Sequence, residues 1–328
     1  MKRFFKSIPV PMTGLILAIL SIGNLFNAYG MGEVGDIIGF AGALLMILIL
    51  AKLIFVFEHT RHDLKNPVIA STVPTFSMGL MVLCTYLMQW FHRQRSVISM
   101  IWLCAIILQI GLIIYFTYYF LIAQDDFTIE HIYPSWFVVY CGLGIVPITC
   151  GHFSPLIGQV IFWVALLFYV ILLPIIIYRV YIHRRFEVHT MPLITITAAP
   201  GSLCLTGYLA AFPHAHIGLV TLLLVVSQAL YVLILFKLPS LLRGAFYPSY
   251  AAFTFPLVIC ATAITKSYHY YATKGMDFQW MNLIATFEMI IAAVIVAYVF
   301  IEYMKHLIRV NAKKEPIPHT DVNDAMNL

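Results

Sequence analysis

Ten apolar segments follow one another along this chain, and each is about 20 residues long or longer. A helix of about 20 apolar residues is long enough to cross the hydrocarbon layer of a membrane. The chain is 62% hydrophobic and 10% charged, whereas a soluble domain has about 25% charged residues. We therefore predict an all-α polytopic membrane protein. The expected spans are roughly 9–29, 34–57, 67–90, 96–122, 134–153, 156–182, 192–212, 216–238, 247–267 and 279–305.

Lysine and arginine predict the orientation of these spans. With a cytoplasmic N-terminus, fifteen such residues fall on the cytoplasmic side: Lys2, Arg3, Lys6, Lys52, Arg61, Lys65, Arg179, Arg184, Arg185, Lys237, Arg243, Lys305, Arg309, Lys313 and Lys314. Four fall on the outer side: Arg93, Arg95, Lys266 and Lys274. Cytoplasmic loops of membrane proteins are enriched in these residues. We expect both termini in the cytoplasm, a single ten-helix domain over residues 1–310 in the plasma membrane, and a polar cytoplasmic tail over 311–328.

Prolines recur along the chain at nearly one period. Pro11, Pro67, Pro134, Pro192 and Pro248 each open an odd-numbered span, at spacings of 56, 67, 58 and 56 residues. Proline suits the first turn of a helix, where its missing N–H needs no partner. Four odd spans carry a second proline 7 to 13 residues later, and these predict helix bends: Pro74, Pro147, Pro200 and Pro256. The period indicates an internal repeat.

Threonine separates the odd spans from the even ones. The odd spans hold eleven threonines and the even spans three, and the even spans are otherwise plain and apolar. Bent helices expose backbone carbonyls that need hydroxyls, water or protein neighbours. We therefore expect the odd helices inside and the even helices facing lipid. The predicted architecture is five helical hairpins with quasi-fivefold symmetry around a central pore.

Ionisable residues are scarce within the spans. Lys52, Glu58 and Lys266 lie near span ends, where long side chains can extend to the interface. Glu288 is the one acidic residue deep in a span; it is a candidate for proton coupling, although its place on an outer helix favours a structural hydrogen bond. The axis is therefore expected to be nearly uncharged, with a basic cytoplasmic rim that enriches anions.

Catalytic and metal-binding patterns are missing from the sequence. His59 and His62 can share a helical face, but the stretch 58–63 is interpreted as a solvated cytoplasmic turn. No phosphate-binding loop, nucleophile elbow or zinc motif occurs, and no aromatic-basic stripe suggests nucleic acid. We expect no enzyme activity, no metal, no cofactor and no nucleic-acid partner.

Short motifs on the odd spans carry a family resemblance. Span 7 reads APGSLCLTGYL over 199–209, span 9 reads YAAFTFP over 250–256, span 5 opens with YPSWF over 133–137, and span 1 opens with PMTG over 11–14. In this order and spacing they resemble the tellurite-resistance/dicarboxylate transporter family. That family includes the bacterial TehA proteins, the yeast malate permease and the plant slow-type guard-cell anion channels. The resemblance covers about residues 8–308.

The resemblance implies a homotrimer with one pore in each protomer and a phenylalanine from span 9 that occludes it. By position this residue is Phe255, followed by Pro256 where some bacterial members have glycine. Residues near bends or helix starts are the candidates for lining the pore: Thr13, Gly14, Thr75, Phe76, Gly144, Thr197, Gly201 and Thr254.

Two transport functions remain open at this point. The first is a passive channel for small inorganic anions or carboxylates, gated by Phe255. The alternative is a proton-coupled secondary transporter of C4-dicarboxylates, or an exporter of oxyanions as in tellurite resistance, which needs a protonatable residue and alternating access. A membrane enzyme or scaffold without transport is disfavoured by the missing catalytic clusters.

Overall fold

The computed structural model describes residues 2–125 and 127–312, and within these ranges it contains helices and no strands. The helices are α1 (Lys2–Ser7), α2 (Met12–Ala28), α3 (Gly32–Phe55), α4 (Phe57–Asp63), α5 (Pro67–Thr72), α6 (Pro74–Trp90), η1 (His92–Gln94), α7 (Arg95–Thr117), η2 (Tyr118–Ile122), η3 (Ile129–His131), α8 (Trp136–Cys141), η4 (Gly142–Gly144), α9 (Ile145–Thr149), η5 (Cys150–His152), α10 (Pro155–Ile177), η6 (Tyr178–His183), η7 (Val188–Ala198), α11 (Ala199–Ala211), α12 (Ile217–Leu241), η8 (Pro248–Phe253), α13 (Phe255–Thr273) and α14 (Gln279–Ala312).

Eight helical stretches in the described residues are long and apolar enough to cross a membrane. They are Gly32–Phe55, Pro67–Trp90, His92–Ile122, Pro155–His183, Val188–Ala211, Ile217–Leu241, Pro248–Thr273 and Gln279–Ala312. Two shorter apolar stretches, Met12–Ala28 and Trp136–His152, coincide with the first and fifth expected spans. The all-helical membrane fold is thus confirmed.

Burial divides the stretches as the sequence predicts. We number the stretches as the ten expected spans. The most apolar 18-residue windows of the third (Pro67–Trp90), seventh (Val188–Ala211) and ninth (Pro248–Thr273) stretches are 83%, 89% and 78% buried. The corresponding windows of the even stretches are 28% to 39% buried. Large apolar side chains such as Ile54, Ile107 and Phe236 are exposed on the even helices. The odd stretches therefore form the interior, and the even helices carry the apolar outer surface.

The second prolines mark changes of helix type. In the third stretch α5 ends at Thr72 and α6 begins at Pro74, so the interruption falls at the proline. In the seventh and ninth, a 3-10 helix gives way to an α-helix whose first turn contains Pro200 or Pro256. In the fifth, Pro147 lies in α9, directly after the 3-10 turn η4. Each interior stretch with two prolines is thus built from two or more short helical pieces, because proline donates no hydrogen bond to the preceding turn.

The expectation for Lys52 was wrong, and the termini and loops differ from the expectations in further details. Lys52 does not extend to the interface: its ammonium is buried and donates a hydrogen bond to the Ile8 carbonyl. The stretch expected to be a solvated turn is the short helix α4, with Thr60 buried. The additional helix α1 precedes the first expected span. Helix α14 continues to Ala312, and the rest of the expected polar tail lies outside the described residues.

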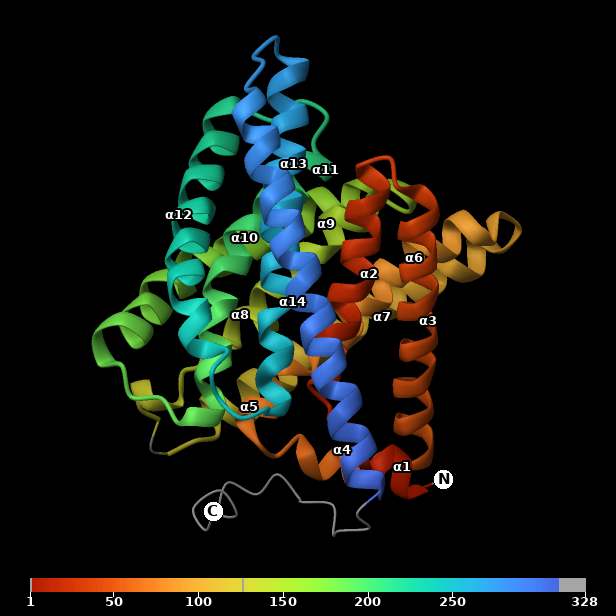
Figure 1. Cartoon of the computed structure of the whole chain (residues 1–328), viewed down its shortest axis with the longest axis vertical. Helices are drawn as coiled ribbons and strands as arrows, with labels where there is room; N and C mark the ends of the chain where they lie inside the picture. The colour runs from red at the N-terminus through yellow and green to blue at the C-terminus, as the bar shows by residue number, and fades with distance from the viewer. Residues whose placement is uncertain (1, 126, 313–328) are drawn as a thin grey trace.

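Helices α1, α4 and α5 lie together at one end of the molecule, the lower end in Figure 1, where α14 also ends. Helix α1 contacts both α3 and α14. We refer to this end, which also carries the chain's N-terminus, as the α1 end.

Candidate functional site: an internal passage

A narrow cavity lies among the interior stretches. Its volume is about 50 Å³, which is the space of a few water molecules. It is lined by Pro11, Gly14, Thr72, Thr75, Met78, Phe137, Val138, Cys141, Leu193, Ile196, Ala199, Pro200, Leu203, Ser249, Ala251, Ala252, Phe255 and Pro256. Within the described part of the chain, no charged side chain lines this cavity, as expected for a nearly uncharged axis.

All five interior stretches contribute to this lining, and they do so at helical spacing. Thr72, Thr75 and Met78 follow one another at intervals of three residues. Leu193, Ile196, Pro200 and Leu203 follow at intervals of three or four in the seventh stretch. Residues three or four apart lie on one face of a helix. The cavity therefore runs along one face of each stretch rather than across it.

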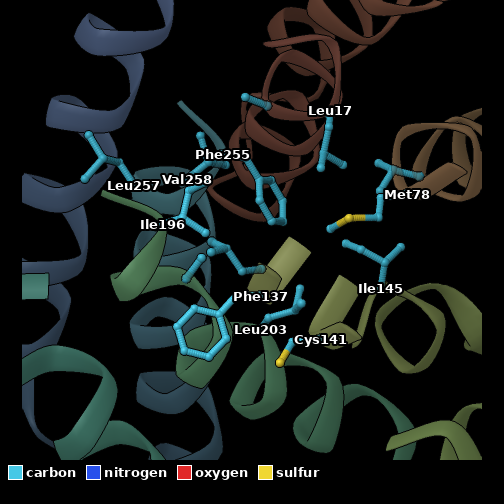
Figure 2. Packing of buried hydrophobic residues seen from close by; sticks show 14 of the residues in the cluster. Leu17, Met78, Phe137, Cys141, Ile145, Ile196, Leu203, Phe255, Leu257 and Val258 are labelled. Atoms are coloured by element: carbon cyan, nitrogen blue, oxygen red, sulfur yellow. The ribbon is translucent and has the colours of Figure 1, made fainter. Parts of the chain in front are cut away.

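Phe255 is one of the residues of this apolar lining. It is the first residue of α13, directly after the 3-10 helix η8, and its side chain is buried. Figure 2 shows its ring pointing into the space between Leu17 of α2, Met78 of α6 and Ile145 of α9. The ring thus forms part of the wall of the narrow cavity, together with Met78.

Hydroxyl groups pair next to the narrow cavity. The Thr13 and Thr75 side-chain oxygens are 2.7 Å apart and link α2 to α6. The Thr75 hydroxyl is also 2.7 Å from the Thr72 carbonyl, to which it donates. Thr254 directly precedes Phe255, and its hydroxyl donates a hydrogen bond of 2.6 Å to the Ala251 carbonyl. The hydroxyls thus satisfy backbone carbonyls where helix geometry is irregular, as the threonine bias of these stretches predicts.

A wider cavity opens at the α1 end. Its volume is about 280 Å³, and it shares Pro11, Thr72, Leu193 and Ser249 with the narrow cavity. The two cavities are therefore adjacent, with these four residues between them, and we call the pair, from the α1 end to Phe255, the passage. We call the wider cavity the vestibule; it is lined by Lys6, Ser7, Ile8, Pro9, Val10, Pro11, His59, Asp63, Asn66, Val68, Ile69, Thr72, His189, Leu193, Tyr247, Pro248, Ser249, His306 and Val310.

The residues singled out in the sequence fall into two groups. Gly14, Thr75, Phe255 and the bend prolines Pro200 and Pro256 line the narrow cavity. The others line neither cavity: Thr13, Phe76, Gly144, Thr197, Gly201, Thr254, Pro74 and Pro147.

Close packing explains the position of two residues in the second group. A Cβ atom on Gly144 would lie 2.8 Å from the Leu203 side chain, and one on Gly201 would lie 2.8 Å from the Tyr169 hydroxyl. Real Cβ contacts are almost never shorter than 3.0 Å. These glycines therefore allow neighbouring helices to approach closely.

Glu288 is buried on α14 and lies outside both cavities. Its carboxyl group is near Gln228 and Tyr231 of α12. One of its oxygens, Oε2, has no hydrogen-bond partner among the described residues, and neither does the Tyr231 hydroxyl. The structure thus leaves a buried carboxyl group between two outer helices.

The sequence interpretation missed most of the apolar lining and the basic groups of the vestibule. Met78, Ile196 and Leu203 line the passage but look like ordinary core residues in the sequence. Their signal is the spacing of three or four residues from Thr75 and Pro200. His189 and His306 had no signal, because the fold alone brings them to one cavity.

An apolar helical bundle with an internal passage is the architecture of a polytopic membrane transport protein. The model of the SLAC1 family, described as voltage-dependent anion channels, matches residues 7–304. The chain therefore belongs to the SLAC1 family, which includes the TehA-like transporters, and the resemblance inferred from the sequence is confirmed. No curated protein matches the chain. The family consists of channels and transporters rather than enzymes, and membership supports anion transport across a membrane.

Proposed function

We propose that the protein is a passive channel for small anions, with Phe255 as the gate of a pore inside each protomer. The observation that carries this proposal is the passage from the vestibule to the Phe255 ring, without a charged side chain in its narrow part. An apolar constriction blocks ions because water leaves it. A cavity of about 50 Å³ has no room for a hydrated anion, so conduction requires the ring to move.

The lining also bears on selectivity. Without a ring of fixed charges, the narrow cavity would bind an anion weakly and discriminate by diameter and dipoles. Weak binding suits rapid passage, because an ion must leave the pore as readily as it enters. Lysine and arginine at the α1 end, including Lys6, would raise the local anion concentration.

The proposed architecture is ten spans over residues 1–310, arranged as five hairpins with quasi-fivefold symmetry. Its support is that each of the five interior stretches lines the narrow cavity. We place the protein in the plasma membrane, and the distribution of lysine and arginine favours both termini, and hence the α1 end, in the cytoplasm. The outer helices would face lipid and, in a homotrimer, two further copies. The mass of the purified protein in detergent tests the trimer.

An anion-flux assay on the purified protein in liposomes tests the channel. A potassium ionophore is added to carry the compensating positive charge. If the protein is a channel, chloride and nitrate should leave the liposomes without a proton gradient. Empty liposomes and liposomes with heat-denatured protein serve as controls. Flux equal to that of the controls would overturn the proposal.

The second candidate is a proton-coupled transporter of C4-dicarboxylates or an exporter of oxyanions. The observation that favours it is the buried Glu288 carboxyl group with an unpartnered oxygen, since intramembrane carboxyl groups often carry protons. Saturable dicarboxylate flux that depends on the proton gradient, and that Glu288→Gln abolishes, would favour this candidate over the channel.

A further inference from the structure

The vestibule brings together basic side chains from four separate parts of the chain. Lys6 comes from α1, His59 from α4, His189 from η7 and His306 from α14. The three histidines are half-buried, so each has part of its surface in the cavity rather than in bulk solvent. Such a convergence from distant segments is a property of the fold and has no sequence motif.

The formal charge of the vestibule depends on these histidines. Its other charged lining residues are Lys6 and Asp63, whose charges cancel. With neutral histidines the lining is therefore neutral overall, and with all three protonated it carries a charge of +3. Histidine changes its charge between about pH 5 and 8. Protonation of these histidines would thus make the lining strongly anion-attracting.

Other charged groups face this cluster and shape its response. Glu187 lies 3.3 Å from the His189 ring nitrogen Nδ1, so His189 gains a carboxylate partner when it is protonated. Asp63 lies near the buried Lys52 of α3, and Arg309 lies near His306 on α14. Tyr247 is the remaining titratable lining residue, with its ring centroid 6.4 Å from that of His189. Counted with these neighbours, the cluster has three cations (Lys6, Lys52 and Arg309) and two anions (Asp63 and Glu187) when its histidines are neutral. Protonation of the histidines adds to this excess of positive charge.

The basic cluster of Lys6 and the three histidines lies in the part of the passage that leads to the narrow cavity. The vestibule and the narrow cavity share residues, so an anion in the vestibule is next to the path to Phe255. Its volume of about 280 Å³ is several times that of the narrow cavity and accepts a small anion with part of its water. Asn66 and Ser249 add polar side chains to its lining.

We infer that the vestibule is an anion-binding site whose affinity rises as His59, His189 and His306 become protonated. The ligand class is small anions such as halide or nitrate, held by diffuse positive charge rather than by a rigid set of donors. This inference rests on the proposed channel, because binding here is taken as the step that fills the pore.

The first test measures chloride flux through full-length protein in liposomes while the pH on the vestibule side is varied from 7.5 to 5.5. We expect the half-saturating chloride concentration to fall several-fold on acidification. The triple variant His59→Asn, His189→Asn, His306→Asn should lose this dependence and resemble the wild type at pH 7.5. The control is His214→Asn, an exposed histidine between α11 and α12, which should behave as the wild type does.

The second test measures binding without transport. Nitrate should raise the unfolding temperature of the detergent-purified wild type more at pH 5.5 than at pH 7.5, since a ligand stabilises the state that binds it. The triple variant should lose this difference. Binding without flux would support the site while the channel proposal fails. Flux or binding with the same pH dependence in the triple variant, or with none in the wild type, would overturn the inference.

Discussion

The Thr13 and Thr75 hydroxyls lie 2.7 Å apart, joining two interior helices that are 62 residues apart in the chain. Thr75 lines the narrow cavity, and Thr13 is its hydrogen-bond partner outside the lining. This hydrogen bond therefore fixes the distance between α2 and α6 next to the proposed gate.

Replacing either threonine by valine should remove this bond at nearly constant volume. We expect each single variant to lose about 1 kcal/mol of unfolding free energy. The double variant should lose less unfolding free energy than the sum of the two single losses, because the shared hydrogen bond can be lost only once. Denaturation in detergent of the wild type, the two single variants and the double variant measures the interaction energy between the two hydroxyls. Strict additivity would show that the two hydroxyls do not stabilise one another.

Lys52→Ala should destabilise the wall of the vestibule. The Lys52 ammonium donates to the Ile8 carbonyl, and Ile8 lines the vestibule. A buried acceptor without its donor costs about 1–3 kcal/mol, so the apparent Tm should fall by several degrees. Lys65→Ala removes an exposed lysine nearby and is the control. Equal Tm values for the two variants would contradict the buried hydrogen bond.

Two glycines on outer helices should respond in opposite ways to alanine. A Cβ on Gly35 would lie 2.5 Å from the Gly23 carbonyl oxygen, so Gly35→Ala must separate α2 from α3. Overpacking of this kind costs about 1–3 kcal/mol. A Cβ on Gly111 of α7 would meet nothing within 4 Å. Gly111→Ala should therefore be neutral or stabilising, by about 0.5–1 kcal/mol. Thermal unfolding of both variants checks the contrast, and an equal loss of stability would be evidence against close α2–α3 packing.

Glu130→Gln should reduce stability in a pH-dependent way. A hydrogen bond from His183, with a further one from Arg185, lowers the pKa of the Glu130 carboxyl group below its usual 4.5. Because the folded-state pKa is the lower one, the contribution is complete above pH 4.5 and is lost as the pH falls through the lowered pKa. The variant should have a slightly lower Tm than the wild type at pH 7, and the difference should vanish in acid. Glu58→Gln removes another exposed carboxylate and is the control; a Glu130→Gln deficit that persists in acid would contradict the account.

Local sequence patterns predicted the positions of the helices and their burial. Pro67 and Pro74 suffice to predict where the third stretch begins and where it is interrupted, because proline lacks an N–H. Contacts between distant residues were not predictable in this way. Lys52 lies near the end of its span and looks exposed, but its partner Ile8 is 44 positions away. His59, His189 and His306 likewise belong to one cavity only because the bundle closes around it. Among the candidate lining residues, Gly14 and Thr75 line the narrow cavity, whereas Thr197 does not. The direction of a side chain depends on its position around the helix, and the proline and threonine pattern alone did not supply that position.

Phe255→Ala is the variant that tests the proposed gate most directly. Phe236→Ala, which removes a ring that is 81% exposed on the outer helix α12, is the matched control. In purified protein reconstituted at equal density into liposomes, we expect Phe255→Ala to raise chloride flux several-fold and Phe236→Ala to leave it unchanged. Chloride flux in Phe255→Ala equal to that of the wild type, with the protein folded, would contradict the role of this ring as the gate.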